Sequence, residues 1–146
     1  KLSATAVQES PELSTQQRIH FPSGIVGFAN FAEAELVYQP DQLPFMWLKG
    51  TGKDGLSFIV VEPNGLVPNY EIEVTDADIQ ALKLDSVDDA LILNIATLQK
   101  GATQSITLNL IGPIIINRRT LEARQIIIGN SQKYSARHLL FETKEG

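Results

Sequence analysis

The stretch Ala90-Leu91-Ile92-Leu93-Asn94-Ile95-Ala96-Thr97-Leu98 holds the longest dense run of apolar residues in the chain. Aliphatic and β-branched residues in such a run predict a strand, and Lys100-Gly101 after it predicts a turn. The next segment, Ser105 to Ile111, alternates apolar and polar side chains, as expected for a half-buried strand. Asn94 and Thr97 interrupt the apolar run, so it does not approach the roughly 18–20 residues of a membrane-spanning helix.

The chain on either side of this pair shows the same pattern of short strands and turns. Pro44 to Lys49 is a dense apolar block, and Leu56 to Val61 follows it after the glycine-rich Gly50 to Gly55, which predicts a β-hairpin. Further strands are expected at residues 18–21, 34–39, 70–74, 113–117 and 125–128. Residues 134–141 fit either a short helix or a strand.

One short helix is expected near residues 76–84. Thr75 or Asp76 can cap its N-terminus, because their side-chain oxygens can accept hydrogen bonds from the free N–H groups of the first turn. Ile79 and Leu82 then share one face. Since strands and helices do not alternate, a doubly wound α/β fold is not expected.

Roughly eight to ten short strands with one helix predict an all-β, mainly antiparallel fold, either a barrel or a sandwich. We expect a compact β-barrel-like single domain over residues 15–146. Residues 1–14 are polar and are predicted to form a flexible N-terminal tail. The length of 146 residues fits one domain.

Charge is unevenly distributed along the chain. The net charge of −5 argues mildly against general nucleic-acid binding. Residues 62–89 hold eight acids and one base, whereas residues 100–137 hold six bases and one acid. These stretches form either two ordinary solvated faces or a polarised surface that steers a charged partner.

A search for catalytic and metal-binding patterns finds none that predicts a site. Without cysteine, disulfides, thiolate zinc sites and cysteine nucleophiles are excluded. Gly50-Thr51-Gly52-Lys53-Asp54-Gly55 matches the dinucleotide-binding glycine pattern literally, but a strand follows it where a helix is needed, so a hairpin turn is predicted. His20 and His138 lack metal-ligand spacing. We therefore expect no catalytic residues, cofactor or metal.

Several segments in order resemble the flagellar assembly factor FliW family. They are Phe21-Pro22-Ser23-Gly24-Ile25-Val26-Gly27-Phe28, Pro44-Phe45-Met46-Trp47-Leu48, Phe58-Ile59-Val60-Val61-Glu62-Pro63, Pro68-Asn69-Tyr70-Glu71, Asn109-Leu110-Ile111-Gly112-Pro113-Ile114-Ile115-Ile116-Asn117, Ala123-Arg124-Gln125-Ile126-Ile127 and Tyr134-Ser135-Ala136-Arg137-His138-Leu139-Leu140. The resemblance extends from Ile19 to Phe141. Asn69 and Gly112 depart from the family pattern, which often has an acid and a larger residue there.

The resemblance implies a β-barrel-like, non-enzymatic, cytoplasmic protein. Family members bind flagellin before its export and antagonise CsrA, a small dimeric RNA-binding repressor of flagellin translation. The family thus implies two protein partners, with no direct nucleic-acid binding and no membrane association. Two other functions stay open: a small-molecule-binding β-barrel protein or enzyme of unknown substrate, and a structural β-domain of a larger assembly.

Two groups of residues are candidates for partner binding. A repressor that holds RNA phosphates is cationic, so an acidic surface could dock on it; the candidates are Glu62, Glu71, Glu73, Asp76 and Asp78. The apolar terminal helices of flagellin would need a hydrophobic groove, for which Phe28 and Trp47 are candidates, with Phe31 and Phe45 beside them. Core packing is the competing role for these aromatic residues.

Overall fold

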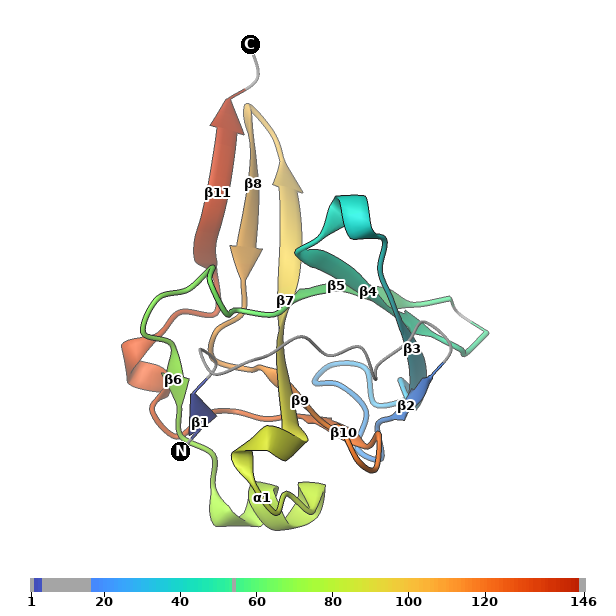
Figure 1. The fold of residues 1–146 in the computed structure, drawn as a ribbon. Coiled ribbons are helices and arrows are strands. Elements are labelled where there is room, and N and C mark those ends of the chain that lie inside the picture. The colour runs from blue at the N-terminus through green and yellow to red at the C-terminus, as the bar shows by residue number, and fades with distance from the viewer. Residues whose placement is uncertain (1, 4–16, 54, 145–146) are drawn as a thin grey trace.

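The computed structural model describes residues 2–3, 17–53 and 55–144, which form an antiparallel sheet structure with one α-helix (Figure 1). The strands are β1 (Leu2–Ser3), β2 (Arg18–His20), β3 (Glu33–Val37), β4 (Phe45–Gly50), β5 (Ser57–Val61), β6 (Glu71–Ile72), β7 (Ala90–Lys100), β8 (Thr103–Leu108), β9 (Ile114–Asn117), β10 (Ala123–Gln125) and β11 (His138–Lys144). The helices are α1 (Asp76–Leu82) and the 3₁₀ turns η2 (Pro40–Gln42), η3 (Val87–Asp89) and η4 (Ser131–Lys133).

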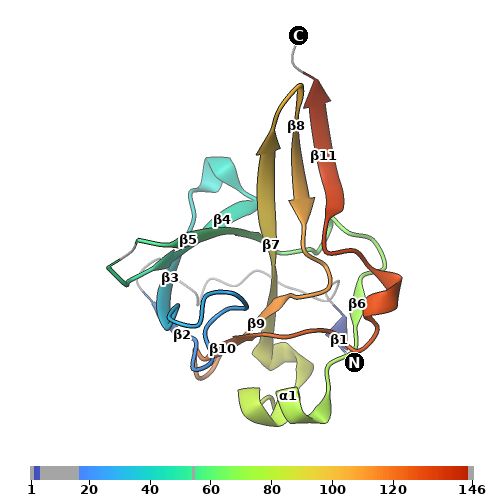
Figure 2. The same ribbon diagram turned by 180° about the vertical axis from the view of Figure 1, so that it is seen from behind.

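The long strand β7 is the centre of the sheet. Its first residues pair with β9, its middle pairs with β5, and its last residues pair with β8. From β5 the sheet continues through β4 and β3 to β2, and from β9 it continues to β10. The end of β7, with β8 and β11, forms a three-stranded arm that projects from the rest of the molecule (Figures 1 and 2).

The two ends of the main sheet meet at a single point. His20 of β2 forms an isolated bridge with Glu122, just before β10, and its N–H donates to the carbonyl of Leu121 at 2.9 Å. This contact is not a continuous ladder, so the sheet is not closed. The predicted all-β, mainly antiparallel class is confirmed, while "barrel-like" describes the shape only loosely.

Two hydrophobic cores lie on opposite faces of β7. Successive side chains of a strand point to opposite faces, so Ile92 and Ala96 pack into the first core and Leu91 and Leu93 into the second. Tyr70, Ile72, Leu82, Leu108 and Ile115 contribute to the first core. Ile19, Phe21, Leu48, Val60 and Ile114 contribute to the second.

The predicted helix ends slightly earlier than expected. Thr75 caps it by accepting a hydrogen bond from the Asp78 N–H, as predicted. Lys83 then adopts a left-handed conformation with φ of 56°, and its N–H bonds back to the carbonyl of Gln80. This backbone reversal ends α1 at Leu82, a common way to satisfy the last carbonyl groups of a helix.

Two predicted strands are shorter than expected. Only Glu71–Ile72 of the expected segment 70–74 forms a ladder, as β6. The strand expected at 125–128 ends at Gln125, although Ile126 and Ile128 still donate to the carbonyls of Pro113 and Ile111. Proline has no N–H with which to return such a bond, so the ladder stops there.

The ambiguous segment 134–141 contains the start of β11, which pairs with β8 from His138 onward. The predicted tail of residues 1–14 lies outside the described residues except for Leu2–Ser3, which pair with β6. The domain boundary therefore stays a prediction. Among the described residues, no helix has the length and apolar character needed to cross a membrane.

Candidate functional site

The two aromatic candidates, Phe28 and Trp47, lie on opposite faces of the β4–β5 hairpin. Trp47 pairs with Ile59 on one face, and the next pair, Leu48 with Phe58, faces the other way. The ring of Phe28 packs edge-on against Phe58 with 5.4 Å between ring centroids. Phe28 therefore borders the second core, and the structure does not bring it together with Trp47.

Trp47 instead lines an apolar groove of about 320 Å³. Its lining residues come from η2, β4, β5, β7 and β8: Gln42, Phe45, Trp47, Ile59, Ala96, Leu98 and Ile106. Phe45, Ile59 and Ile106 are only partly buried and pack against the first core. The groove is thus a place where that core opens to the surface.

The groove lies in a fork between β5 and β7. Their pairing ends at Ile59 with Ala96, yet β7 continues to Lys100 and β5 begins at Ser57. The two strands diverge beyond that pair, with the β4–β5 hairpin on one side and the arm on the other (Figure 1). Within the part of the chain that the structure describes, no strand lies in the fork to cover the apolar side chains that face it.

Most of the lining was missed by the sequence-based search. Phe45 and Trp47 stand out as aromatic residues, but Ala96, Leu98 and Ile106 belong to strands predicted as ordinary sheet. The only local signal was Leu98, an apolar residue at the end of the β7 run next to polar Gln99 and Lys100. It is 45% exposed in the structure.

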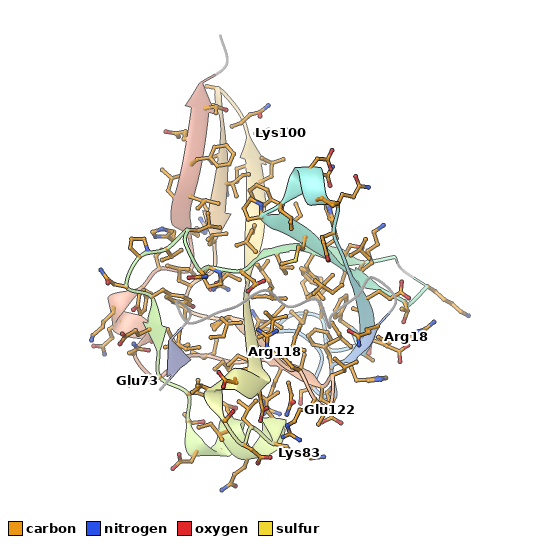
Figure 3. All side chains as sticks on the ribbon, viewed as in Figure 1. Arg18, Glu73, Lys83, Lys100, Arg118 and Glu122 are labelled. Carbon is orange, nitrogen blue, oxygen red and sulfur yellow. The ribbon has the colours of Figure 1, made fainter. Side chains whose placement is uncertain are left out.

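Three of the five acidic candidates gather along one edge of the molecule. Glu71 and Glu73 point outward, because Tyr70, Ile72 and Val74 between and beside them are buried. Asp76 follows in the first turn of α1 and is exposed. We call Glu71, Glu73 and Asp76 the acidic edge; Figure 3 labels Glu73 beside β6.

Hydrogen bonds from a neighbouring segment hold the backbone of this edge. The Asn130 side chain accepts from the Glu73 N–H at 3.0 Å and donates to the Glu71 carbonyl at 2.8 Å. The Gly129 N–H donates to the Glu73 carbonyl at 2.7 Å. The carboxylates of Glu71 and Glu73 therefore project from a fixed backbone.

The other two acidic candidates do not belong to the acidic edge, and each lies near an arginine. The Asp78 carboxylate lies 3.3 Å from Nε of Arg124, and its side chain is 19% exposed. Glu62, after the end of β5, is half-buried. Burial raises the pKa of Glu62, and the positive charge of Arg118 partly opposes this rise.

The acidic and basic stretches of the sequence meet in the structure. Arg119 pairs with Asp85 at 3.0 Å and with Asp89 at 3.2 Å, and it also donates to the carbonyl of Lys83 at 2.8 Å. The pKa of Asp89 is lowered, chiefly by the hydrogen bond from the Asp85 N–H and further by Arg119. Part of the charge asymmetry thus joins the β9–β10 hairpin to the segment that follows α1, so these charges form neither two separate solvated faces nor a surface wholly open to a partner.

The glycine-rich segment Gly50 to Gly55 and His20 occupy a turn and a surface cluster in the structure. Gly50 ends β4 and the chain returns as β5, so the predicted hairpin turn is confirmed. His20 belongs to an exposed cluster in which its Nδ1 lies 3.2 Å from Glu33, which also pairs with Arg18 at 2.8 Å. Within residues 2–3, 17–53 and 55–144, no group of three or more histidine or carboxylate side chains is arranged to hold a metal ion.

Comparison with known proteins assigns the fold to a family. The family model described as "FliW protein" matches residues 3–140. The chain belongs to the FliW family. A flagellar assembly factor FliW from Leptospira biflexa is 31% identical over 134 residues, covering 92% of this chain and 87% of that protein.

Other FliW proteins give the same result. The one from Geotalea uraniireducens is 36% identical over 128 residues, covering 87% of this chain and 76% of the relative. The one from Bacillus subtilis is 31% identical over 126 residues, covering 86% and 87%. A crystal structure of the flagellar assembly factor FliW superposes with a TM-score of 0.73 at 27% identity, covering 92% of this chain and 90% of that one. The name that these relatives carry, flagellar assembly factor, does not denote an enzymatic activity.

Several hydrogen bonds that hold loops of the structure lie within the segments that carry the FliW resemblance. The Tyr134 hydroxyl accepts from the Glu71 N–H at 3.0 Å and lies 3.1 Å from the carbonyl of Asn69, which has a positive φ of 60°. Asn109 accepts from the N–H groups of Ile111 and Gly112. The same segments also contribute Phe45, Trp47 and Ile59 to the groove and Glu71 to the acidic edge.

Proposed function

We propose that this FliW-family chain is a non-enzymatic, cytoplasmic flagellar assembly factor that binds flagellin and antagonises the translational repressor CsrA. Binding of the repressor would free flagellin messages for translation, and free flagellin would compete for the factor. The chain would thereby couple the level of flagellin to its synthesis. It would do so by protein contacts alone, without binding nucleic acid or a membrane.

The observation that carries the proposal is the acidic edge on a domain of this family. A repressor that neutralises RNA phosphates has a cationic surface. Glu71 and Glu73 project from a backbone fixed by Asn130 and Gly129, so they present negative charge without large rearrangement, and Asp76 follows them in the first turn of α1. Complementary charge of this kind chiefly raises the association rate and selects the partner. Of the predicted acids, Glu62 and Asp78 lie near arginines and would contribute less.

The alternative of a small-molecule carrier is less well supported by the groove. Ligand pockets commonly span about 300–1,000 Å³ and place a few polar groups to orient the ligand. This groove, of about 320 Å³, is at the small end of that range. Among the described residues that line it, only Gln42 and Trp47 carry a hydrogen-bonding side-chain group, an amide and an indole N–H. An apolar lining of this kind suits side chains of a protein partner better.

Calorimetric titration with CsrA tests the acidic edge. We expect the double variant Glu71→Lys/Glu73→Lys to bind CsrA at least tenfold more weakly than the unmodified chain, with a stronger effect at low salt. The matched pair is Glu73→Lys at the edge and Glu142→Lys on β11 of the arm, which make the same change of charge at one position each. Equal affinities for this pair, with normal melting curves, would contradict the proposed role of this edge.

Binding of flagellin is tested by competition. A preformed complex with CsrA is titrated with monomeric flagellin, and the released CsrA is measured by size-exclusion chromatography. We expect stoichiometric release. If neither CsrA nor flagellin binds at micromolar concentration, the proposed function is wrong.

A further inference from the structure

We propose that the groove in the fork between β5 and β7 binds the apolar face of an amphipathic helix whose flanks carry acidic side chains. This inference deepens the proposed function, on which it rests for the identity of the natural partner, because it assigns a place to the apolar contact. The proposal itself concerns the chemistry of the occupant: one helix, two or three aliphatic anchors, and carboxylates beside them.

The apolar surface continues from the groove across the arm. Leu98 on β7 is the register partner of Ile106 on β8, and Ile106 is the partner of Phe141 on β11. Cross-strand partners share one face of a sheet, so the three side chains form a row. Leu98 and Phe141 remain 45% and 44% exposed. The row extends the groove beyond the residues that enclose it.

The spacing of this row suits a helix that crosses the strands. Neighbouring strands lie about 4.7–4.9 Å apart, and one turn of an α-helix advances about 5.4 Å. Anchors at positions i, i+4 and i+7 of a helix therefore fall close to successive strands of the arm and to the fork, the known mode of helix-in-groove binding. An extended segment would instead run along a strand edge and use backbone groups, which the lining side chains do not supply.

Charge at the margin of the groove favours acidic flanks. Lys100 follows Leu98 by two residues and Lys49 follows Trp47 by two, so each lies on the same strand face as its groove residue. Among the described residues neither lysine has an ion pair. Glu35 is the register partner of Lys49, so of these two lysines Lys100, on the arm, is less offset by a neighbouring acid (Figure 3).

The size of the groove argues against a second copy of this chain as the occupant. A stable protein–protein interface uses about 20–30 residues on each side. Seven residues line the groove, and the row on the arm adds Phe141. This surface is sufficient for one helix but not for a dimer that would persist through it alone.

The groove contains its own reporter, because Trp47 is the only tryptophan of the chain. The probe is a synthetic 18-residue peptide with leucines at i, i+4 and i+7 and glutamates on both flanks. We expect a saturable change in Trp47 emission on titration and helical circular dichroism of the bound peptide. A second peptide with lysines in place of the glutamates should bind at least fivefold more weakly.

Two exposed leucines of the arm provide a matched pair of variants. Leu98→Asp places a charge on the groove face and should weaken peptide binding at least tenfold. Leu139 is 52% exposed but pairs with Thr107, which pairs with Thr97, so it lies on the other face of the arm. Leu139→Asp should leave binding unchanged. Lys100→Glu, which leaves the residues that line the groove unchanged, should reverse the preference between the two peptides.

The proposal is overturned if neither peptide gives a saturable signal, or if the two aspartate variants weaken binding equally. It is also overturned if the bound peptide is extended, or if sedimentation shows that copies of the chain associate through the groove. Flagellin that binds without affecting Trp47 emission, and binds Leu98→Asp normally, would overturn the groove assignment and leave the proposed function standing. Peptide binding without flagellin binding would leave the groove assignment standing and contradict the flagellin part of the proposed function.

Discussion

The Tyr70 hydroxyl and the Asn94 side-chain amide lie 3.1 Å apart, and both residues are fully buried. The hydroxyl also donates to the carbonyl of Leu110 at 2.6 Å, while the Asn94 amide donates to the carbonyl of Asn109 at 2.9 Å. Buried carbonyl groups without partners destabilise a fold. This pair therefore fixes the loop between β8 and β9 against the first core. Asn94 lies on β7 two residues before Ala96, which lines the groove.

Removing the Tyr70 hydroxyl should destabilise the protein and alter its response to alkali. We expect Tyr70→Phe to lower the free energy of unfolding in urea by about 1–3 kcal/mol at pH 7, because Leu110 and Asn94 lose a partner. Burial raises the pKa of Tyr70 to about 12 from 10.0. Tyr70 thus ionises first in the unfolded chain, and the unfolding free energy of the unmodified protein should fall as pH rises from about 10 towards 12. Tyr70→Phe should lack this part of the fall. A variant with the same alkaline slope as the unmodified chain would contradict this.

The half-buried carboxyl of Glu62 should slightly lower the free energy of unfolding at neutral pH. Because its pKa is raised above 4.5 by burial, its contribution to stability is greatest below that value and is lost as pH rises through the folded-state pKa. Glu62→Gln should therefore raise the unfolding free energy at pH 7, by less than about 1 kcal/mol given its partial exposure. The gain should vanish near pH 4. Denaturation at both pH values checks the sign; a loss at pH 7 would show that the attraction to Arg118 prevails.

Asn117 should matter much more to α1 than the ion pairs of Arg119. Asn117 is fully buried, donates to the carbonyls of Leu82 and Lys83 and accepts from the N–H of Arg119. Asn117→Ala should cost about 2 kcal/mol or more, since it leaves buried groups unpaired. Arg119→Ala should cost below about 1 kcal/mol, because the arginine is 48% exposed. Hydrogen exchange in α1 should rise only in the first variant; equal effects would refute the ranking.

Substitution of two glycines in the turn after β2 allows the effect of a steric clash to be distinguished from that of backbone strain. Both have positive φ, 67° for Gly24 and 84° for Gly27. A Cβ on Gly24 would lie 2.6 Å from the carbonyl oxygen of Ala29, whereas one on Gly27 would meet nothing within 4 Å. Gly27→Ala should cost about 1–2 kcal/mol from conformation alone, and Gly24→Ala clearly more. Thermal melts of the two variants compare them, and a similar loss would exclude the predicted clash.

The hairpin of β4 and β5 was predictable because its signals are local: an apolar block, a glycine-rich turn and a second apolar block. The groove was not, since Trp47 meets Leu98 and Ile106 only through the pairing of β5 with β7, far apart in the sequence. Periodicity assigns a residue to a face but not to a neighbour. It could not show that Phe28 and Trp47 point to opposite sides of one hairpin.

The acidic candidates show the same limit. Alternation correctly placed Glu71 and Glu73 on the solvent side of the segment 70–74, of which β6 is part. Asp78 carries an equal charge, yet Arg124 reaches it because the β9–β10 hairpin folds beside α1. Whether a charge is open to a partner depends on such contacts, which a count of acids along the chain does not contain.

The placement of the two cores on β7 has a consequence for how the molecule denatures. Each core loses one wall if β7 leaves the sheet, because alternate side chains of the same strand enter both. Neither core can then melt while the other persists as a separate unit. Heat or denaturant should remove them in one all-or-none transition, with the calorimetric and van't Hoff enthalpies equal.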